Sequence, residues 1–380
     1  MIQAALGALG ERDEGTRALL LASLSEVTDA RDWRRRLEFA NEAMARADGL
    51  NDAGKLAVAV MSYQFRAQPD ALAARLDETE WACGVAQRLG DPVLRFRASF
   101  NRIHACIEVG DLTEVDRRIG DLGALVERTG LPECRWELLL TRTWRAILAG
   151  DLSTGELLND ETFVVASDLE RPEAVASYGG VLFEIRILQG RISELIETLT
   201  RAAAENPALD VLRVALASAY CSLGRMEEAK PLFERDAATA FTKIPRDPTW
   251  TTSMDLFAEC AVALRDREAA ATLYHLILPY EKMVVFLYGT IWGSFARSLG
   301  RLAHFLGHRD AAHAHFDTAL SINERIESPY FVSRTQLDYA ELLRDVGKTT
   351  EATGLVNQAF DTAKQYGFAG LESRATTFSA

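Results

Sequence analysis

A turn residue recurs about every forty positions along this chain, and that repeat constrains the fold more than any other feature. The recurring positions are Gly110, Gly150, Gly190, Gly224, Arg265, Gly307 and Gly347, at intervals of 40, 40, 34, 41, 42 and 40 residues. Two further steps towards the N-terminus fall near Asp70 and Ala30. Self-similarity at this period is typical of helical solenoids. We therefore predict an all-α, right-handed superhelical solenoid of about nine antiparallel helical hairpins.

The residues around each turn have the spacing expected of a helical hairpin. Tyr220, Gly224, Ala229 and Phe233 are separated by four, five and four residues. Glycine enters the left-handed backbone region without strain, and a small residue lets the second helix approach the first closely. We expect a positive φ at the turn glycines. The same spacing surrounds two other turns, with Ala303, Gly307, Ala312 and Phe316 and with Leu343, Gly347, Ala352 and Val356.

Apolar residues follow a helical period throughout the chain. Before Gly307, Phe295, Leu299, Leu302 and Leu306 recur at steps of three and four residues, which places them on one helical face. No segment shows the sustained alternation of apolar and polar residues that marks a half-buried strand. The predicted helix content is therefore far above the usual third of a globular protein.

The chain is expected to form one repeat array over residues 1–380. The least regular stretch, Phe241 to Trp250, contains two prolines and suggests a subdivision into residues 1–241 and 248–370. Residues 371–380 are expected to be a frayed tail.

Composition excludes several classes of protein. The net charge of −13 disfavours direct binding to nucleic acid, and no run of eighteen apolar residues could span a membrane. The first fifteen residues lack the basic segment of a signal peptide. The five cysteines are scattered without a paired spacing, so we interpret them as packing residues in a reducing cytoplasm.

Two stretches imitate chemical motifs. Residues 304–316 (HFLGHRDAAHAHF) contain four of the six histidines, but a predicted turn interrupts them and no ligand set has zinc spacing. Residues 347–349 (GKT) resemble the end of a phosphate-binding loop, but that motif needs a glycine at position 342, where this chain has leucine. We expect no catalytic residues and no bound metal, nucleotide or other cofactor.

The first helices of the hairpins are predicted to line a concave face that is basic and partly aromatic. Such a groove suits an acidic peptide or ligand. Arg297, Arg301 and Arg334 are expected to converge on one acidic group and to lie outside the core. Glu184, Asp255 and Glu259 are acidic exceptions on this face. The predicted lining residues are Arg97, Phe100, His104, Trp144, Arg297, Arg301, His304, Arg334 and Arg344.

Residues 205–370 resemble the C-terminal tetratricopeptide-type repeats of large bacterial signalling and transcription regulators. The resemblance rests on the stretches PRDPTWTTSMDLFAECAVAL, EAAATLYHLILPY, GSFARSLGRLAHFLGHRDAAHAHFDTALSINERI and SRTQLDYAELL. In such regulators an AAA- or STAND-type ATPase precedes the repeats, and a nucleotide-cyclase or LuxR-type DNA-binding domain lies elsewhere in the polypeptide. None of the family's catalytic residues can be carried over, because we expect the domains that contain them to be absent from this chain.

The sequence therefore predicts a non-catalytic sensor or protein-interaction module of a bacterial signalling or transcription regulator. Its expected partner is a protein, peptide or small effector, bound without direct contact to nucleic acid or membrane. Two alternatives remain open. One is a free-standing adaptor or scaffold, and the other is the helical part of an enzyme, either a hydrolase built around the histidines or an ATPase or cyclase polypeptide.

Overall fold

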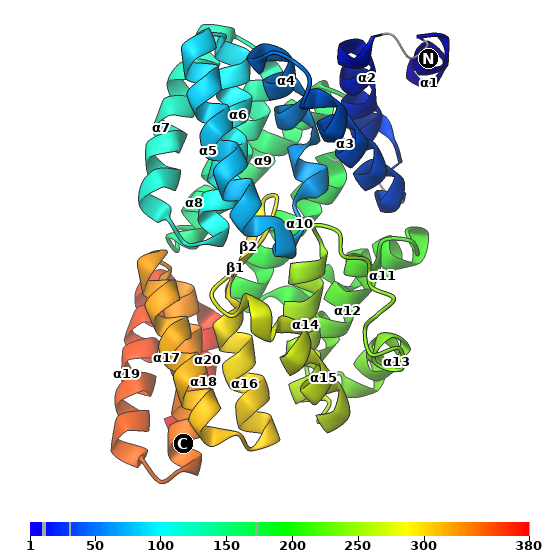
Figure 1. Cartoon of the computed structure of the whole chain (residues 1–380). Coiled ribbons are helices and arrows are strands. Elements are labelled where there is room, and N and C mark those ends of the chain that lie inside the picture. Colours follow the sequence, from blue (N-terminus) through cyan, green and yellow to red (C-terminus); the bar gives the residue numbers. More distant parts are fainter. Residues whose placement is uncertain (10–12, 30–31, 172–173, 380) are drawn as a thin grey trace. The chain divides into compact units, whose positions relative to one another are not determined.

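Twenty α-helices form almost all of the structure that the computed structural model describes, which comprises residues 1–9, 13–29, 32–171 and 174–379 (Figure 1). This confirms the predicted all-α helical repeat. The helices are α1 (Ile2–Ala8), α2 (Glu14–Val27), α3 (Trp33–Ala47), α4 (Asp52–Ser62), α5 (Leu72–Leu89), α6 (Pro92–Glu108), α7 (Leu112–Thr129), α8 (Pro132–Leu148), α9 (Leu152–Asp168), α10 (Ala174–Leu188), α11 (Ile196–Glu205), α12 (Asp210–Ser222), α13 (Met226–Ala237), α14 (Trp250–Ala263), α15 (Arg267–Ile277), α16 (Phe295–Leu306), α17 (Arg309–Arg325), α18 (Pro329–Asp345), α19 (Thr349–Tyr366) and α20 (Ala369–Ser379). Short 3₁₀ helices are η1 (Tyr63–Arg66), η2 (Pro69–Ala71), η3 (Ile192–Leu195) and η4 (Leu278–Tyr280).

The described helices pair as the forty-residue period predicts. Seven hairpins, from α6–α7 to α18–α19, turn at the seven predicted positions, and α4–α5 turns across Tyr63–Ala71, near Asp70. The ninth hairpin is α2–α3, whose predicted turn at Ala30 lies outside the described residues. Proline begins α6, α8 and α18, because it fits the first helical turn and disfavours a helix before it.

The turn residues adopt the left-handed backbone that the hairpin spacing requires. Gly224, Gly307 and Gly347 have φ of +71°, +89° and +82°, which confirms the expectation for these glycines. Arg265 occupies the equivalent position with φ +59°, in a region that is strained for a residue with a Cβ atom.

Replacing Arg265 by glycine is expected to raise the free energy of unfolding by about 0.5–1 kcal/mol, since relief of the left-handed strain outweighs the added freedom of the unfolded chain. The matched control is Gly307→Ala, where an added Cβ would contact nothing within 4 Å, so that only backbone strain changes. It should lower stability by about 1–2 kcal/mol. Chemical denaturation measures both values. A destabilising Arg265→Gly would show that the arginine side chain stabilises its turn.

A two-stranded antiparallel hairpin interrupts the helices, in a segment where the sequence shows no sustained alternation of apolar and polar residues. β1 (Val284–Leu287) pairs with β2 (Thr290–Ser294) through a turn at Tyr288 and Gly289. The segment forms strands because it is rich in β-branched and aromatic residues and contains a two-residue loop with glycine. Buried side chains on both faces of β2 hide the alternation that marks a half-exposed strand.

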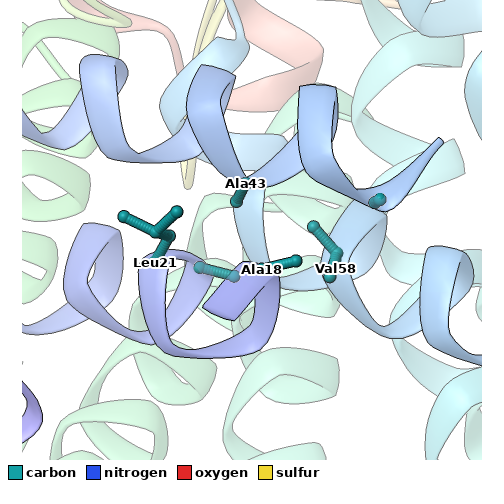
Figure 2. Packing of buried hydrophobic residues seen from close by; sticks show 6 residues of the cluster. Ala18, Leu21, Ala43 and Val58 are labelled. Atoms are coloured by element: carbon teal, nitrogen blue, oxygen red, sulfur yellow. The ribbon is translucent and has the colours of Figure 1, made fainter. Parts of the chain in front are cut away.

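The chain divides into two compact units, which we describe separately. Unit 1 comprises Met1–Cys106, Thr113–Leu138 and Arg246–Pro248, and unit 2 comprises Ile107–Leu112, Leu139–Pro245 and Thr249–Ala380. Part of the core of unit 1 lies among α2, α3 and α4, where Ala18, Leu21, Ala43 and Val58 pack together (Figure 2). The alanines let the three helices approach closely. The division into residues 1–241 and 248–370 stays a prediction.

Unit 2 closes on itself through its hairpin turns. A Cβ atom added to Gly150 would lie 2.6 Å from Cδ1 of Tyr366, and one added to Gly190 would lie 2.9 Å from the backbone nitrogen of Gly370. Gly110 likewise lies against the side chain of Arg325, whose Nε donates to the Gly110 carbonyl at 3.2 Å. The later repeats of unit 2 therefore contact the turns of its earlier repeats.

The C-terminal segment, expected to fray, is helical in the structure. Helix α20 continues to Ser379, and Leu371 and Ala375 on it are buried. Arg374 of the same helix pairs with Asp338 of α18. These apolar and ionic contacts hold the last helix in place.

Candidate functional site

Three arginines of the predicted groove form an ionic network in unit 2 around the buried Arg297 and Asp338. Arg297 of α16 lies between two acids, with its Nη1 atom 2.6 Å from Oε1 of Glu259 and its Nε atom 2.7 Å from Oδ2 of Asp338. Glu259 belongs to α14 and Asp338 to α18. Arg301 pairs with the same two acids, and Nη2 of Arg334 lies 3.1 Å from Oε1 of Glu259. The predicted convergence of three guanidinium groups is thus present, on acids of the same chain.

Two further groups extend the network to α20 and along α14. Nη2 of Arg374 lies 2.6 Å from Oδ1 of Asp338 and 2.7 Å from Oε1 of Glu341. On α14, Asp255 accepts a hydrogen bond from the hydroxyl of Ser298. Four arginines and four acids therefore lie along the first helices α14, α16, α18 and α20, and their formal charges cancel.

Burial and charge shift the pKa values of this network in opposite directions. Burial alone would raise the pKa of Asp338, but Arg297, Arg374, Arg301 and Arg334 together hold it well below its usual range. Burial raises the pKa of Asp255, although the same cluster of arginines opposes the rise. Arg297 is only 2% exposed, so the expectation that it lies outside the core is wrong. Arg297 can be buried between neighbouring repeats because Glu259 and Asp338 neutralise its charge.

Three aromatic or histidine residues of the predicted lining belong to the core. Trp144 is fully buried, and its ring packs edge-on against Phe286 of β1 with centroids 5.4 Å apart. In unit 1, Phe100 and His104 are buried with ring centroids 4.4 Å apart. Burial, with help from Arg75, lowers the pKa of His104 to about 3, so its imidazole is neutral. Their apolar surfaces stabilise the stack of helices and are closed to a ligand.

Three other predicted residues are exposed or partly exposed. Arg97 is about one third exposed and its Nη1 atom lies 2.5 Å from Oε1 of Glu137. His304 contacts Asp345, with Nε2 and Oδ2 3.0 Å apart. Arg344 is exposed and its guanidinium lies 4.2 Å from the centroid of the Phe378 ring. Arg97 lies in unit 1, whereas His304 and Arg344 lie in unit 2, so the structure gives no basis for treating all three as one surface.

The histidines of residues 304–316 contact tyrosine and carboxylate side chains, and His308 and His315 share Tyr274. No group of three or more histidine, cysteine, aspartate or glutamate side chains in the described ranges is arranged to hold a metal ion. A shallow surface depression lies over the turn at Gly307. Lys348, the lysine of the phosphate-loop look-alike, pairs with Glu351 in the first turn of α19. The histidine contacts are His304 with Asp345, His308 with Tyr274, His313 with Tyr339, and His315 with both Tyr274 and Glu281.

The β-hairpin packs against α8 and α10 at Trp144 and Glu184, two positions that the sequence predicts to lie on the concave face. Phe286 packs on Trp144 of α8, and Trp292 packs on Phe183 of α10 with ring centroids 5.8 Å apart. The carboxylate of Glu184, also on α10, accepts a hydrogen bond from the backbone N–H of Ile291 at 3.1 Å. This part of unit 2 thus already holds an extended segment of its own chain. The acidic residue at position 184, noted in the sequence as an exception, serves that contact.

Glu184 is fully buried, and its Oε1 atom has no hydrogen-bond partner among the residues that the structure describes. Burial raises the pKa of Glu184 well above its ordinary 4.5, despite the opposing hydrogen bond from Ile291. The native state therefore favours the protonated acid. Its contribution to stability is complete below pH 4.5 and is lost as pH rises towards the folded-state pKa.

Replacing Glu184 by glutamine is expected to remove the loss of stability at higher pH. The amide still accepts the hydrogen bond from Ile291 and cannot ionise. The variant should gain stability over the parent by up to about 1.4 kcal/mol for each pH unit above the ordinary pKa, until the folded-state pKa is reached. Chemical denaturation at several pH values between 4 and 8 measures the difference. The control is the exposed Glu205→Gln, whose difference should stay flat. Parallel curves for both variants would contradict the burial argument.

Comparison with known families identifies one repeat directly. Residues 212–248 match the family described as Tetratricopeptide repeat, and they contain most of α12, all of α13 and the segment that follows. A search of curated proteins finds no match to the chain. None of the helices in the described ranges combines the length and apolar character needed to cross a lipid bilayer. The match and the stacked hairpins together show a tetratricopeptide-type helical repeat region.

Proposed function

We propose that this chain is a non-catalytic helical-repeat module that binds a protein or peptide partner. The observation that carries the proposal is the tetratricopeptide match at residues 212–248, within an array of stacked hairpins. Tetratricopeptide repeats generally mediate contacts between proteins. Helical-repeat proteins present extended surfaces built from several neighbouring repeats, which suit a protein or peptide better than a small metabolite.

Fewer residues are available to bind a partner than the sequence predicts. Arg297, Arg301 and Arg334 are engaged with Glu259 and Asp338, so they supply little uncompensated charge. Arg344 is the most exposed of the predicted groove residues in unit 2, and we place an acidic part of the partner beside it. His304, on the preceding first helix α16, contacts Asp345 next to Arg344 and adds a second polar group there.

We also propose, from the resemblance to bacterial regulators, that the module passes the binding event to an ATPase or transcription output. Its location would then be the cytoplasm. The observation that tests this affiliation is the reading frame around the coding sequence. A P-loop ATPase encoded in the same frame supports it, and its absence favours a free-standing adaptor.

The binding proposal is tested by capture of partners from native lysate on the immobilised full chain, followed by mass spectrometry. Arg344→Glu should weaken capture of a specific partner about tenfold and reduce the salt dependence of binding, because a charged contact is lost. The control is Lys364→Glu, the same change of charge at an exposed position on the second helix α19. Equal losses for the two variants, or none, would reject the Arg344 surface, and failure to capture any partner would reject the module itself.

A further inference from the structure

A glutamate, a histidine and a tyrosine of unit 2 form a chain of hydrogen bonds. His315 of α17 lies between the other two, with its Nδ1 atom 2.6 Å from Oε1 of Glu281 and its Nε2 atom 2.9 Å from the hydroxyl oxygen of Tyr274. Tyr274 belongs to α15, and Glu281 follows the short helix η4. Helices α15 and α17 are the second helices of successive hairpins, and 41 residues separate Tyr274 from His315. One repeat period therefore brings the tyrosine against the histidine.

The two hydrogen bonds fix which nitrogen of His315 carries the proton. The carboxylate of Glu281 only accepts hydrogen bonds, so Nδ1 carries the hydrogen and donates it. In the neutral imidazole Nε2 then has a free lone pair, which accepts the hydrogen bond from the Tyr274 hydroxyl. His315 is 6% exposed, so packing holds its ring in this orientation. The arrangement places His315 to take the phenolic proton as a general base and Glu281 to stabilise the resulting imidazolium.

Tyr274 is half-buried, and its ring lies beside a surface depression. The shallow depression at the start of α17 is lined by His308, whose ring centroid is 6.3 Å from that of Tyr274. Burial and the charge of Glu281 raise the pKa of Tyr274, so the phenol is protonated at neutral pH and needs a base when it reacts. Arg309 and Asp310 also line the depression, with opposite charges. A neutral electrophile therefore suits this site better than a phosphoryl donor, whose negative charge Glu281 would repel.

We propose that Tyr274 is a modification site that takes an acyl group from an activated ester or thioester. The Tyr274 oxygen attacks the carbonyl carbon while Nε2 of His315 takes the phenolic proton. The bond from that carbon to the leaving oxygen or sulfur breaks, and the alcohol or thiol leaves with the proton held by His315. Tyr274 is then an aryl ester, and His315 is neutral again. This acyl transfer does not depend on the binding of a protein partner.

This site is tested by treating the full chain with para-nitrophenyl acetate and following acetylation of each tyrosine by peptide mapping. The comparison within the chain is Tyr339, which is also half-buried and whose hydroxyl lies 3.1 Å from Nδ1 of His313. In the described ranges His313 has no carboxylate partner. Tyr274 should be acetylated about tenfold faster than Tyr339, because the carboxylate makes His315 the stronger base. Removal of the acetyl group by hydroxylamine distinguishes the tyrosine ester from a lysine amide.

Matched variants separate activation by His315 from simple exposure of Tyr274. His315→Gln keeps a hydrogen-bonding side chain but supplies no base, so acetylation of Tyr274 should slow about a hundredfold while that of Tyr339 is unchanged. Glu281 acts through His315, so it is a positioning residue. Glu281→Gln should slow acetylation of Tyr274 about tenfold, because the amide can donate to Nδ1 and leave the proton on Nε2. Glu281→Asp should restore part of the rate, since it keeps the carboxylate.

The comparison of Tyr274 with Tyr339 in the parent chain stands alone as a test if a variant folds poorly. The proposal is overturned if the two tyrosines are acetylated at equal rates. It is also overturned if His315→Gln folds like the parent and leaves the rate at Tyr274 unchanged.

Discussion

Replacing Asp338 by asparagine is expected to lower the free energy of unfolding by about 3–5 kcal/mol, because it removes one of the two counter-charges of the buried Arg297 and of the partly buried Arg374. Asp338 is 1% exposed, and Arg297 and Arg374 approach its carboxylate at 2.7 and 2.6 Å. Asparagine has nearly the same volume, so no cavity contributes to the loss. Denaturant unfolding with circular dichroism detection measures the effect.

The matched control lies on the same helix. Asp345→Asn removes a carboxylate whose side chain is 57% exposed and whose partner is His304, and it should cost at most about 1 kcal/mol because water screens the pair. Equal losses for the two variants would mean that the network is not buried in solution.

The stability difference between the parent and Asp338→Asn should also depend on pH. The folded-state pKa of Asp338 is depressed, so its contribution is complete above the ordinary value of 3.8 and is lost as pH falls further. The difference between parent and Asp338→Asn should therefore persist from pH 7 down to about pH 4. A difference that shrinks already near pH 6 would place the effect on another group.

The sequence was sufficient to predict the hairpins because each turn has a local chemical requirement. A left-handed residue every forty positions, followed by a small residue and a large apolar one, defines one repeat, and the structure places a turn at each of Gly110, Gly150 and Gly190. Even Arg265, the one non-glycine in the series, has a positive φ. A second series with the same period joins successive hairpins. It includes Gly90, Gly130, Glu170, Glu327 and Gly367, all with positive φ.

The ionic network could have been predicted from the same period, but single residues gave no sign of it. Stacked first helices bring together residues about one repeat apart, and hydrogen-bonded side chains here are separated by 38 residues (Glu259 and Arg297), 42 (Glu259 and Arg301) and 41 (His304 and Asp345). Opposite charges at that spacing therefore indicate internal pairs. Basic residues counted alone indicate an open groove, whereas Glu259 and Asp338 on neighbouring repeats pair with them.

The local sequence favours strands in the β-hairpin, but the position of the hairpin and the closure of unit 2 depend on contacts between residues far apart in the sequence. Phe286 of β1 packs on Trp144 and Trp292 of β2 packs on Phe183, and both partners are more than 100 residues away in the sequence. The contact between Gly190 and Gly370 spans 180 residues. The turn at Gly190 and the start of α20 at Gly370 could each form without the other, so neither local sequence indicates the contact.

Replacing Gly190 by alanine is expected to open this closure at a cost well above that of backbone strain alone. The matched control is Gly224→Ala, because both glycines have φ +71°. An alanine at Gly224 contacts nothing within 4 Å, so it should cost only about 1–2 kcal/mol of left-handed strain. At Gly190 the new Cβ would lie 2.9 Å from the backbone nitrogen of Gly370 and 3.1 Å from its Cα, and overpacking should add about 1–3 kcal/mol.

Hydrogen exchange distinguishes loss of the closure from general destabilisation. In Gly190→Ala the amides of α20 should lose protection first, because Gly370 lies in the first turn of that helix and must move away. Gly224→Ala should lower protection around α12 and α13 and leave α20 protected. Gly370→Ala adds its Cβ at 3.4 Å from the Gly190 Cα, an ordinary contact distance, and should be nearly neutral. Gly190→Ala and Gly224→Ala could lower the free energy of unfolding equally and leave α20 protected. The turns of the earlier repeats would then not contact the last helix in solution. Unit 2 would then be an open stack, with the inner side of its last repeats accessible to a partner.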